Sequence, residues 1–146
     1  MASRFSTGLV NKVLDTGSLD SVLPAFFVDV YSGTQPTDAN DAPTGVKLCT
    51  LYSNGTSNPL SWNAAAVGGV LGKNSGETWS TTVTQAGIAG WFRVRLAGDS
   101  NTSSTTDPRI DGAIGVSGAE INLASTNLAL NAPLTLSSFT VTLPRS

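Results

Sequence analysis

The chain has 146 residues, a net charge of −2 and only 12% charged residues, about half of the ~25% typical of soluble domains. A domain of this length can bury roughly 70% of its unfolded surface without disulfides or metals. The eight basic residues form no cluster, which argues against nucleic-acid binding, and no apolar run approaches the ~20 residues of a membrane helix. The N-terminal residues lack the continuous apolar core of a signal peptide. A neutral surface rich in Ser, Thr, Asn and Gly protects poorly against association and favours an assembled protein over an isolated secreted β-sandwich.

Residues 1–5 are expected to form a loose arm that leads into two short helices. Ser6 or Thr7 can cap a first helix that runs to Asp15, and Ser18 can cap a second helix that Pro24 ends. Helices this short are not stable alone. We therefore predict that residues 1–24 form an arm that docks on the rest of the chain or on a neighbouring molecule. Its apolar side chains are candidate assembly contacts: Phe5, Leu9, Val10, Val13 and Leu14.

Residues 25–146 are predicted to form an all-β domain, an antiparallel β-sandwich or jelly roll of about eight short strands. Residues 25–32 are the strongest strand, and because both of its faces are largely apolar, both are expected to be covered. Residues 46–52 follow as a strand that ends in an Asn-Gly turn. Further strands are expected at residues 60–64, 109–116, 120–124, 126–130 and 133–143. Two long polar loops, residues 33–45 and 97–107, interrupt this pattern.

Residues 77–96 are predicted to form a hairpin on which the rest of the sheet packs. Apolar and basic residues alternate along its second half: Phe92, Arg93, Val94, Arg95 and Leu96. This alternation is typical of a strand with one buried face and one wet face. Since charges are sparse in this chain, Arg93 and Arg95 are two further candidates for contacts with a neighbouring subunit.

No stretch of the sequence reads as a catalytic or metal site. The absence of histidine removes Ser-His-Asp triads and the common zinc sites. The single cysteine, Cys49, lies in an apolar run and is expected to be a small buried hydrophobe. The acidic residues show no spacing that singles out a catalytic carboxylate pair, and the loop aspartates match no calcium-loop pattern. We therefore predict a protein that is not an enzyme and has no cofactor and no metal site.

Four segments carry a resemblance that runs in the same order over most of the chain. They are FSTGLVNKVLDTGSL from residue 5, VDVYSGTQPTDANDAPTGVKLCTL from residue 28, GETWSTTVTQAGIAGWFRV from residue 76 and DPRIDGAIGVSGAEINLAS from residue 107. These segments resemble a group of small virion proteins that tailed bacteriophages encode. The resemblance implies a component of the phage particle that is made in the cytoplasm of the bacterial host. It implies no catalytic or ligand residues.

Composition and resemblance together predict a capsid decoration, or cement, protein. Its expected partners are copies of itself, as a dimer or trimer, and the major capsid protein, with no nucleic acid and no membrane. A tail, collar or baseplate component of the virion is the first alternative. A carbohydrate-binding module for host attachment is the second, because aromatic faces stack on sugar rings. That second alternative requires at least one exposed side chain among Trp62, Trp79 and Trp91.

Overall fold

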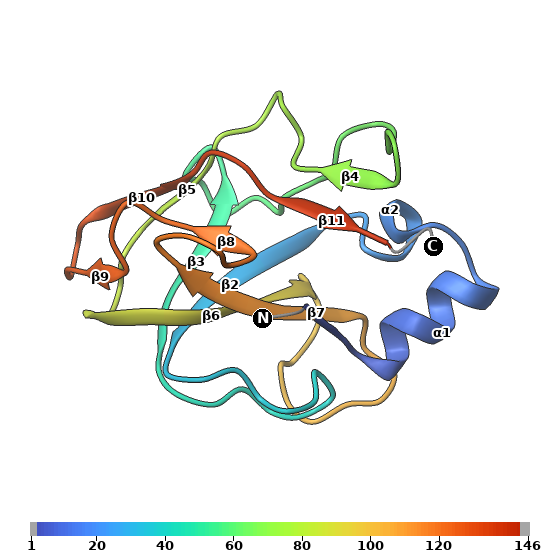
Figure 1. The fold of residues 1–146 in the computed structure, drawn as a ribbon, viewed down its shortest axis with the longest axis horizontal. Coiled ribbons are helices and arrows are strands. Elements are labelled where there is room, and N and C mark those ends of the chain that lie inside the picture. Colours follow the sequence, from blue (N-terminus) through green and yellow to red (C-terminus); the bar gives the residue numbers. More distant parts are fainter. Residues whose placement is uncertain (1–2, 144–146) are drawn as a thin grey trace.

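The computed structural model of the chain describes residues 3–143, and strands predominate in it (Figure 1). In chain order the elements are β1 (Arg4–Phe5), α1 (Thr7–Asp15), α2 (Leu19–Val22), β2 (Phe26–Ser32), β3 (Lys47–Ser53), β4 (Val70–Gly72), β5 (Trp79–Thr82), β6 (Gly87–Leu96), β7 (Arg109–Gly115), β8 (Ile121–Asn122), β9 (Asn127–Leu128), β10 (Pro133–Leu136) and β11 (Thr140–Thr142). The predicted all-β class with short N-terminal helices is confirmed.

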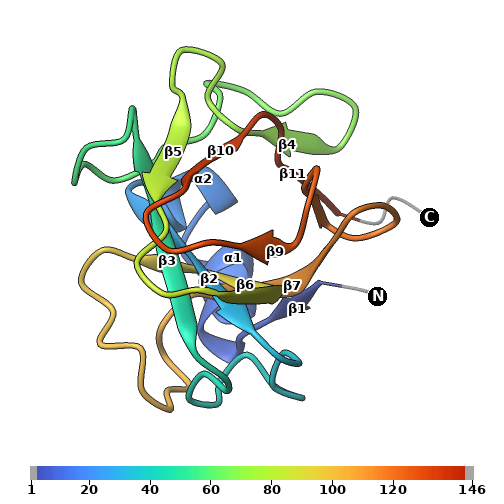
Figure 2. The ribbon, with the colours of Figure 1, turned by 90° about the vertical axis from the view of Figure 1, so that its left-hand side faces the viewer.

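The strands form one large sheet and one small sheet. The large sheet has the order β1-β7-β6-β2-β3-β5-β10, with β8 added beside β7 and β9 beside β6, and the small sheet pairs β11 with β4. All the strand pairs in the described residues are antiparallel except β7 with β8. The small sheet lies across the molecule from β2, β6 and β7, so the core is enclosed between them (Figure 2).

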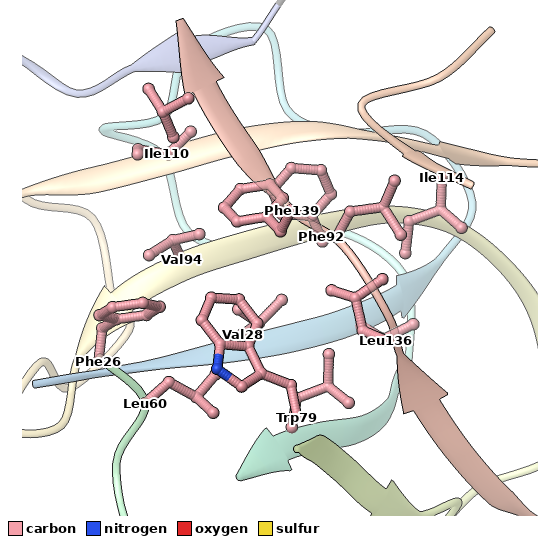
Figure 3. Close-up of a cluster of buried hydrophobic side chains, with 14 of the residues drawn as sticks. Phe26, Val28, Leu60, Trp79, Phe92, Val94, Ile110, Ile114, Leu136 and Phe139 are labelled. Atoms are coloured by element: carbon pink, nitrogen blue, oxygen red, sulfur yellow. The ribbon is translucent and has the colours of Figure 1, made fainter. Parts of the chain in front are cut away.

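The core is aromatic at its centre. Trp79, Phe92 and Phe26 are fully buried there, and their side chains converge from three different strands (Figure 3). Phe139 joins them with its ring centroid 5.4 Å from that of Phe92 in an edge-on arrangement, a geometry that aromatic pairs prefer. The predicted placement of Phe92 and Val94 in the core is confirmed.

The predicted hairpin at residues 77–96 is wrong. β5 pairs with β3 and β10, whereas β6 pairs with β2, β7 and β9, so the two strands are not neighbours. Between them the chain bonds elsewhere: the amide of Val83 donates to Ala132 and that of Thr84 to Leu48, each at 2.9 Å. A Cβ added at Gly87 would lie 2.8 Å from a methyl group of Leu48. The glycine therefore marks a close approach to β3 and does not form a hairpin turn.

Several local predictions are confirmed, and three are wrong. β2 is covered on both faces, and the Asn-Gly turn is present because Asn54 and Gly55 both adopt positive φ. The strand expected at residues 133–143 is interrupted: β10 pairs with β5, whereas β11 pairs with β4 in the other sheet. The arm expected to be loose contains β1, which pairs with β7. Residues 60–64 make only isolated bridges.

The two predicted N-terminal helices are confirmed with their caps. The Ser6 hydroxyl accepts the amide of Leu9 at the start of α1, and the Ser18 hydroxyl accepts that of Ser21 at the start of α2. The segment packs against the same core as the strands, because Leu9 and Leu23 belong to that buried cluster. Docking on the chain's own sheet therefore supplies the tertiary contacts that such short helices need.

Candidate assembly interface

An apolar groove lies between α1 and the end of β11. Its volume is about 250 Å³, and every side chain that lines it is apolar. The lining residues are Phe5, Leu9, Val10, Val13, Leu14, Leu19, Val141 and Leu143. The five candidate contacts predicted in the N-terminal arm therefore meet on one surface, which we name the α1–β11 groove.

The apolar residues of α1 divide between the core and the surface. Leu9 is only 3% exposed, whereas Val10 is 42% and Leu14 is 80% exposed. Residues four positions apart lie on the same face of a helix. Val10 and Leu14 therefore form an apolar ridge on the outer side of the groove, which the chain itself leaves uncovered.

A larger hollow of about 590 Å³ continues the groove toward β4. It shares Val13, Leu19, Val141 and Leu143 with the groove and is also lined by the alanines of residues 64–66. The two hollows form one continuous surface at the end of the molecule where α1, α2 and β11 come together (Figure 1). The exposed apolar side chains gathered here make this surface the candidate interface of the chain.

Three residues of the groove were not among the predicted contacts. Leu19 lies in α2, and Val141 and Leu143 lie in and after β11, more than one hundred residues later in the chain. Their juxtaposition with α1 depends on the break between β10 and β11, which carries the chain into the small sheet. Nothing local in the sequence signals this contact, because it depends on the long-range pairing of β11 with β4.

The other two candidate contacts, Arg93 and Arg95, do not line this groove. They project from β6 on the face of the large sheet opposite the core, and the prediction that this face is wet is wrong. Arg93 is fully buried, and Arg95 is largely buried. The polar loops of residues 33–45 and 97–107 lie along this side of β2, β6 and β7 (Figures 1 and 2). We name this surface the covered face.

Ion pairs within the chain satisfy the arginines of the covered face. Arg93 holds Asp111 with two bonds of 2.7 Å, and Arg95 donates to Asp29 at 2.6 Å. The cross-strand register explains the first pair, since Arg93 in β6 lies directly opposite Asp111 in β7. The acids that Arg93 and Arg95 contact therefore belong to the same chain.

A third pair joins the covered face to a loop. Arg109 in β7 donates to both carboxylate oxygens of Asp99 at 2.7 Å. Burial acts to raise the pKa of Asp99, but the hydrogen bonds from Arg109 and from the amide of Asn101, together with the charges of Arg109 and Arg95, outweigh it and hold the pKa below its ordinary value. For Asp111, burial raises the pKa above its ordinary value despite the opposing effect of Arg93.

All three tryptophans are buried. Trp79 and Trp91 are fully buried and Trp62 nearly so. Each indole N–H also has a partner: the carbonyl of Leu23 for Trp62, the carboxylate of Glu77 for Trp79, and the carbonyl of Thr44 for Trp91. The exposed aromatic face that a carbohydrate-binding module requires is therefore not provided by a tryptophan.

Four of the acidic residues are engaged in structural bonds. Asp29, Asp99 and Asp111 hold arginines, and Glu77 accepts from Ser61 and Trp79. Residues 3–143 contain no cluster of three or more metal-ligating side chains. Burial raises the pKa of the Cys49 thiol to about 12, so a thiolate is scarce at neutral pH.

Comparisons with known protein families, curated proteins and solved structures find no match for this chain. None of the described helices is long and apolar enough to cross a membrane.

Proposed function

We propose that this chain is a structural protein of a tailed-phage particle, with no catalytic role, and that it serves as a capsid decoration protein. In this proposal the fold is a β-sandwich that carries the α1–β11 groove as its docking surface for the major capsid protein. The observation that carries the proposal is the groove itself: α1 is folded and capped, yet Leu14 and Val10 remain exposed beside a wholly apolar hollow. The resemblance to small virion proteins supports the same function.

The distribution of charge supports an assembled state. The three ion pairs of the covered face use six of the eighteen charged residues in the chain. Few charges are therefore left to keep copies apart in solution, in a chain already poor in charge. A surface of this kind suits a lattice, where neighbouring subunits cover it. It also supports self-association as a dimer or trimer.

A decoration protein needs only modest contacts per copy. Fully burying one leucine or valine side chain contributes roughly 1.5–3 kcal/mol, and the loss of freedom on association offsets part of this gain. Because the protein binds the assembled shell and not its dissociated subunits, binding shifts the equilibrium toward the shell. Many copies on one particle multiply a small contribution from each groove.

The test compares two leucine substitutions in the full chain. Leu14→Asp replaces an apolar side chain of the groove, one that is 80% exposed, by a charged one. Leu130→Asp makes the same substitution outside the groove, at a side chain that is 57% exposed. Particles that lack the protein are incubated with each variant, and gel densitometry gives the bound copies. We expect Leu14→Asp to weaken binding at least about tenfold, which corresponds to 1.4 kcal/mol, and Leu130→Asp to bind normally.

Equal binding of the two variants would remove the groove from the proposal. The copy number of the wild-type protein separates the decoration function from the tail, collar or baseplate alternative. Hundreds of copies per virion support decoration, whereas tens or fewer support the alternative.

A further inference from the structure

Arg109 connects α1 to the loop of residues 97–107. From this junction we infer that the buried Asp99–Arg109 ion pair holds α1 in position and thereby sets the shape of the α1–β11 groove. The effect on α1 concerns this chain alone. Its consequence for particle binding rests on the function proposed above.

The first part of the connection is Ser6, the capping residue of α1. Its hydroxyl donates to the carbonyl of Asp107 at 2.7 Å, and it accepts the amides of Arg109 at 2.8 Å and Leu9 at 3.1 Å. The amide of Ser6 in turn donates to the carbonyl of Arg109 at 3.1 Å. The start of α1 is therefore bonded to the backbone on both sides of Pro108, where the loop enters β7.

The second part is direct packing of the helix on the loop. A Cβ added at Gly8 would collide with the carbonyl group of Thr106 and would lie 2.7 Å from the carbonyl oxygen of Asp107. The first turn of α1 therefore rests on the loop backbone without an intervening side chain. This close approach explains a glycine at a helical position, where glycine is otherwise unfavourable.

The ion pair fixes the other end of the same loop. Asp99 accepts both Arg109 bonds and also the amide of Asn101 at 2.7 Å. Asn101 then donates to the hydroxyl of Tyr31 at 2.6 Å and accepts from Arg93 at 3.2 Å. The loop contains no bulky apolar residue. Polar contacts, and not hydrophobic burial, therefore hold it on the sheet.

The consequence of breaking the pair follows from the burial of Arg109. Its guanidinium is fully buried and stays charged at any accessible pH. Without Asp99 its nearest acid is Asp107, at 3.7 Å, and its Nη1 atom already has no partner in the described residues. A buried charge held only by this longer contact, to an acid that is itself 37% exposed, is unfavourable. The side chain must therefore reach water by displacing the loop on which Ser6 and Gly8 rest.

The experiment measures amide hydrogen exchange in the full chain without any partner. Asp99→Asn removes the charge but keeps the shape of the side chain, and Asp41→Asn is the control because Asp41 is exposed on the other loop. We expect Asp99→Asn to speed exchange in residues 6–15 at least about tenfold over the control, while β2 and β6 change less than about twofold. Unchanged exchange in residues 6–15 would overturn the inference.

A second variant covers the case in which Asp99→Asn does not fold. Gly8→Ala disturbs the packing of α1 on the loop from the helix side, because the added methyl group would collide with the backbone of Thr106. It should speed amide exchange at residues 99–107. Unchanged exchange there would equally overturn the inference. Particle binding then separates this inference from the proposed function. If Asp99→Asn mobilises α1 but particles bind the variant normally, the inference stands and the groove is not the docking surface.

Discussion

The buried pair of Arg93 and Asp111 leads to the largest predicted loss of stability. Both side chains are fully buried, and two bonds of 2.7 Å join them in the fork geometry that guanidinium and carboxylate prefer. Arg93→Met keeps the apolar stem but leaves Asp111 without its cation. Breaking a buried pair by removing one partner costs about 3–5 kcal/mol. Since domains have total stabilities of about 5–15 kcal/mol, this variant should be close to unfolding.

Urea unfolding followed by tryptophan fluorescence measures this cost. Lys47→Met is the matched control, because Lys47 is an exposed lysine on β3, and it should change the free energy of unfolding by less than about 0.5 kcal/mol. The double variant Arg93→Met with Asp111→Asn removes both charges, and it should recover at least about 1 kcal/mol relative to Arg93→Met. A cost below about 1 kcal/mol for Arg93→Met would refute the argument that this pair is a main support of the covered face.

Two further predictions concern the start of α1 and high pH. Ser6→Ala removes a helix cap and leaves the buried amide of Arg109 without its acceptor, so the free energy of unfolding should fall by about 2–4 kcal/mol, against about 1 kcal/mol for the exposed cap Ser18. Similar urea midpoints for the two alanine variants would contradict this reasoning. Burial raises the pKa values of Cys49 and Tyr31 to about 12 from ordinary values of 9.0 and 10.0. A group whose pKa is raised in the folded state contributes stability that is lost as the pH rises from its unfolded-state pKa to its folded-state pKa. The urea midpoint should therefore decrease as the pH is raised from 9 to 12. In the folded protein Cys49 should also resist thiol reagents at pH 8 until urea is added. A flat profile would refute the burial of these groups.

Features that depend on neighbouring residues could be predicted from the sequence. The cap at Ser6, the stop before Pro24 and the turn at Asn54–Gly55 follow from backbone chemistry within a few positions. The strand at residues 26–32 was predictable for the same reason, because its alternation of apolar residues is a local signal. These signals establish which segments are strands but not which strands pair.

The wrong predictions are those that depend on which strands pair with one another. The segment at residues 77–96 contains two genuine strands, but nothing local records that β5 belongs beside β10, which lies some fifty residues later. Long-range pairing also places Arg93 of β6 directly opposite Asp111 of β7. One signal was present: Asp29 lies in a strand with both faces covered. A carboxylate in such a place requires a cation on an adjacent strand.

The contacts of the two polar loops could not be predicted from the sequence for a related reason. Their composition lacks bulky apolar residues, and that usually indicates a segment that water surrounds. Asp99 and Asn101 bond to groups that the sheet supplies, Arg109 of β7 and Tyr31 of β2. Composition describes what a loop contains, but the ion pairs that position it come from strands elsewhere in the chain.

The covered face and the α1–β11 groove are two results of one distribution of charge. Arginine side chains usually lie on the surface of a domain. In this chain Arg93 and Arg109 are buried in ion pairs beneath two loops that have little apolar surface to bury. Val10 and Leu14 remain exposed on the outer surface. Because the loop that Asp99 fixes also supports the start of α1, internal ion pairing and the exposed groove are mechanically linked.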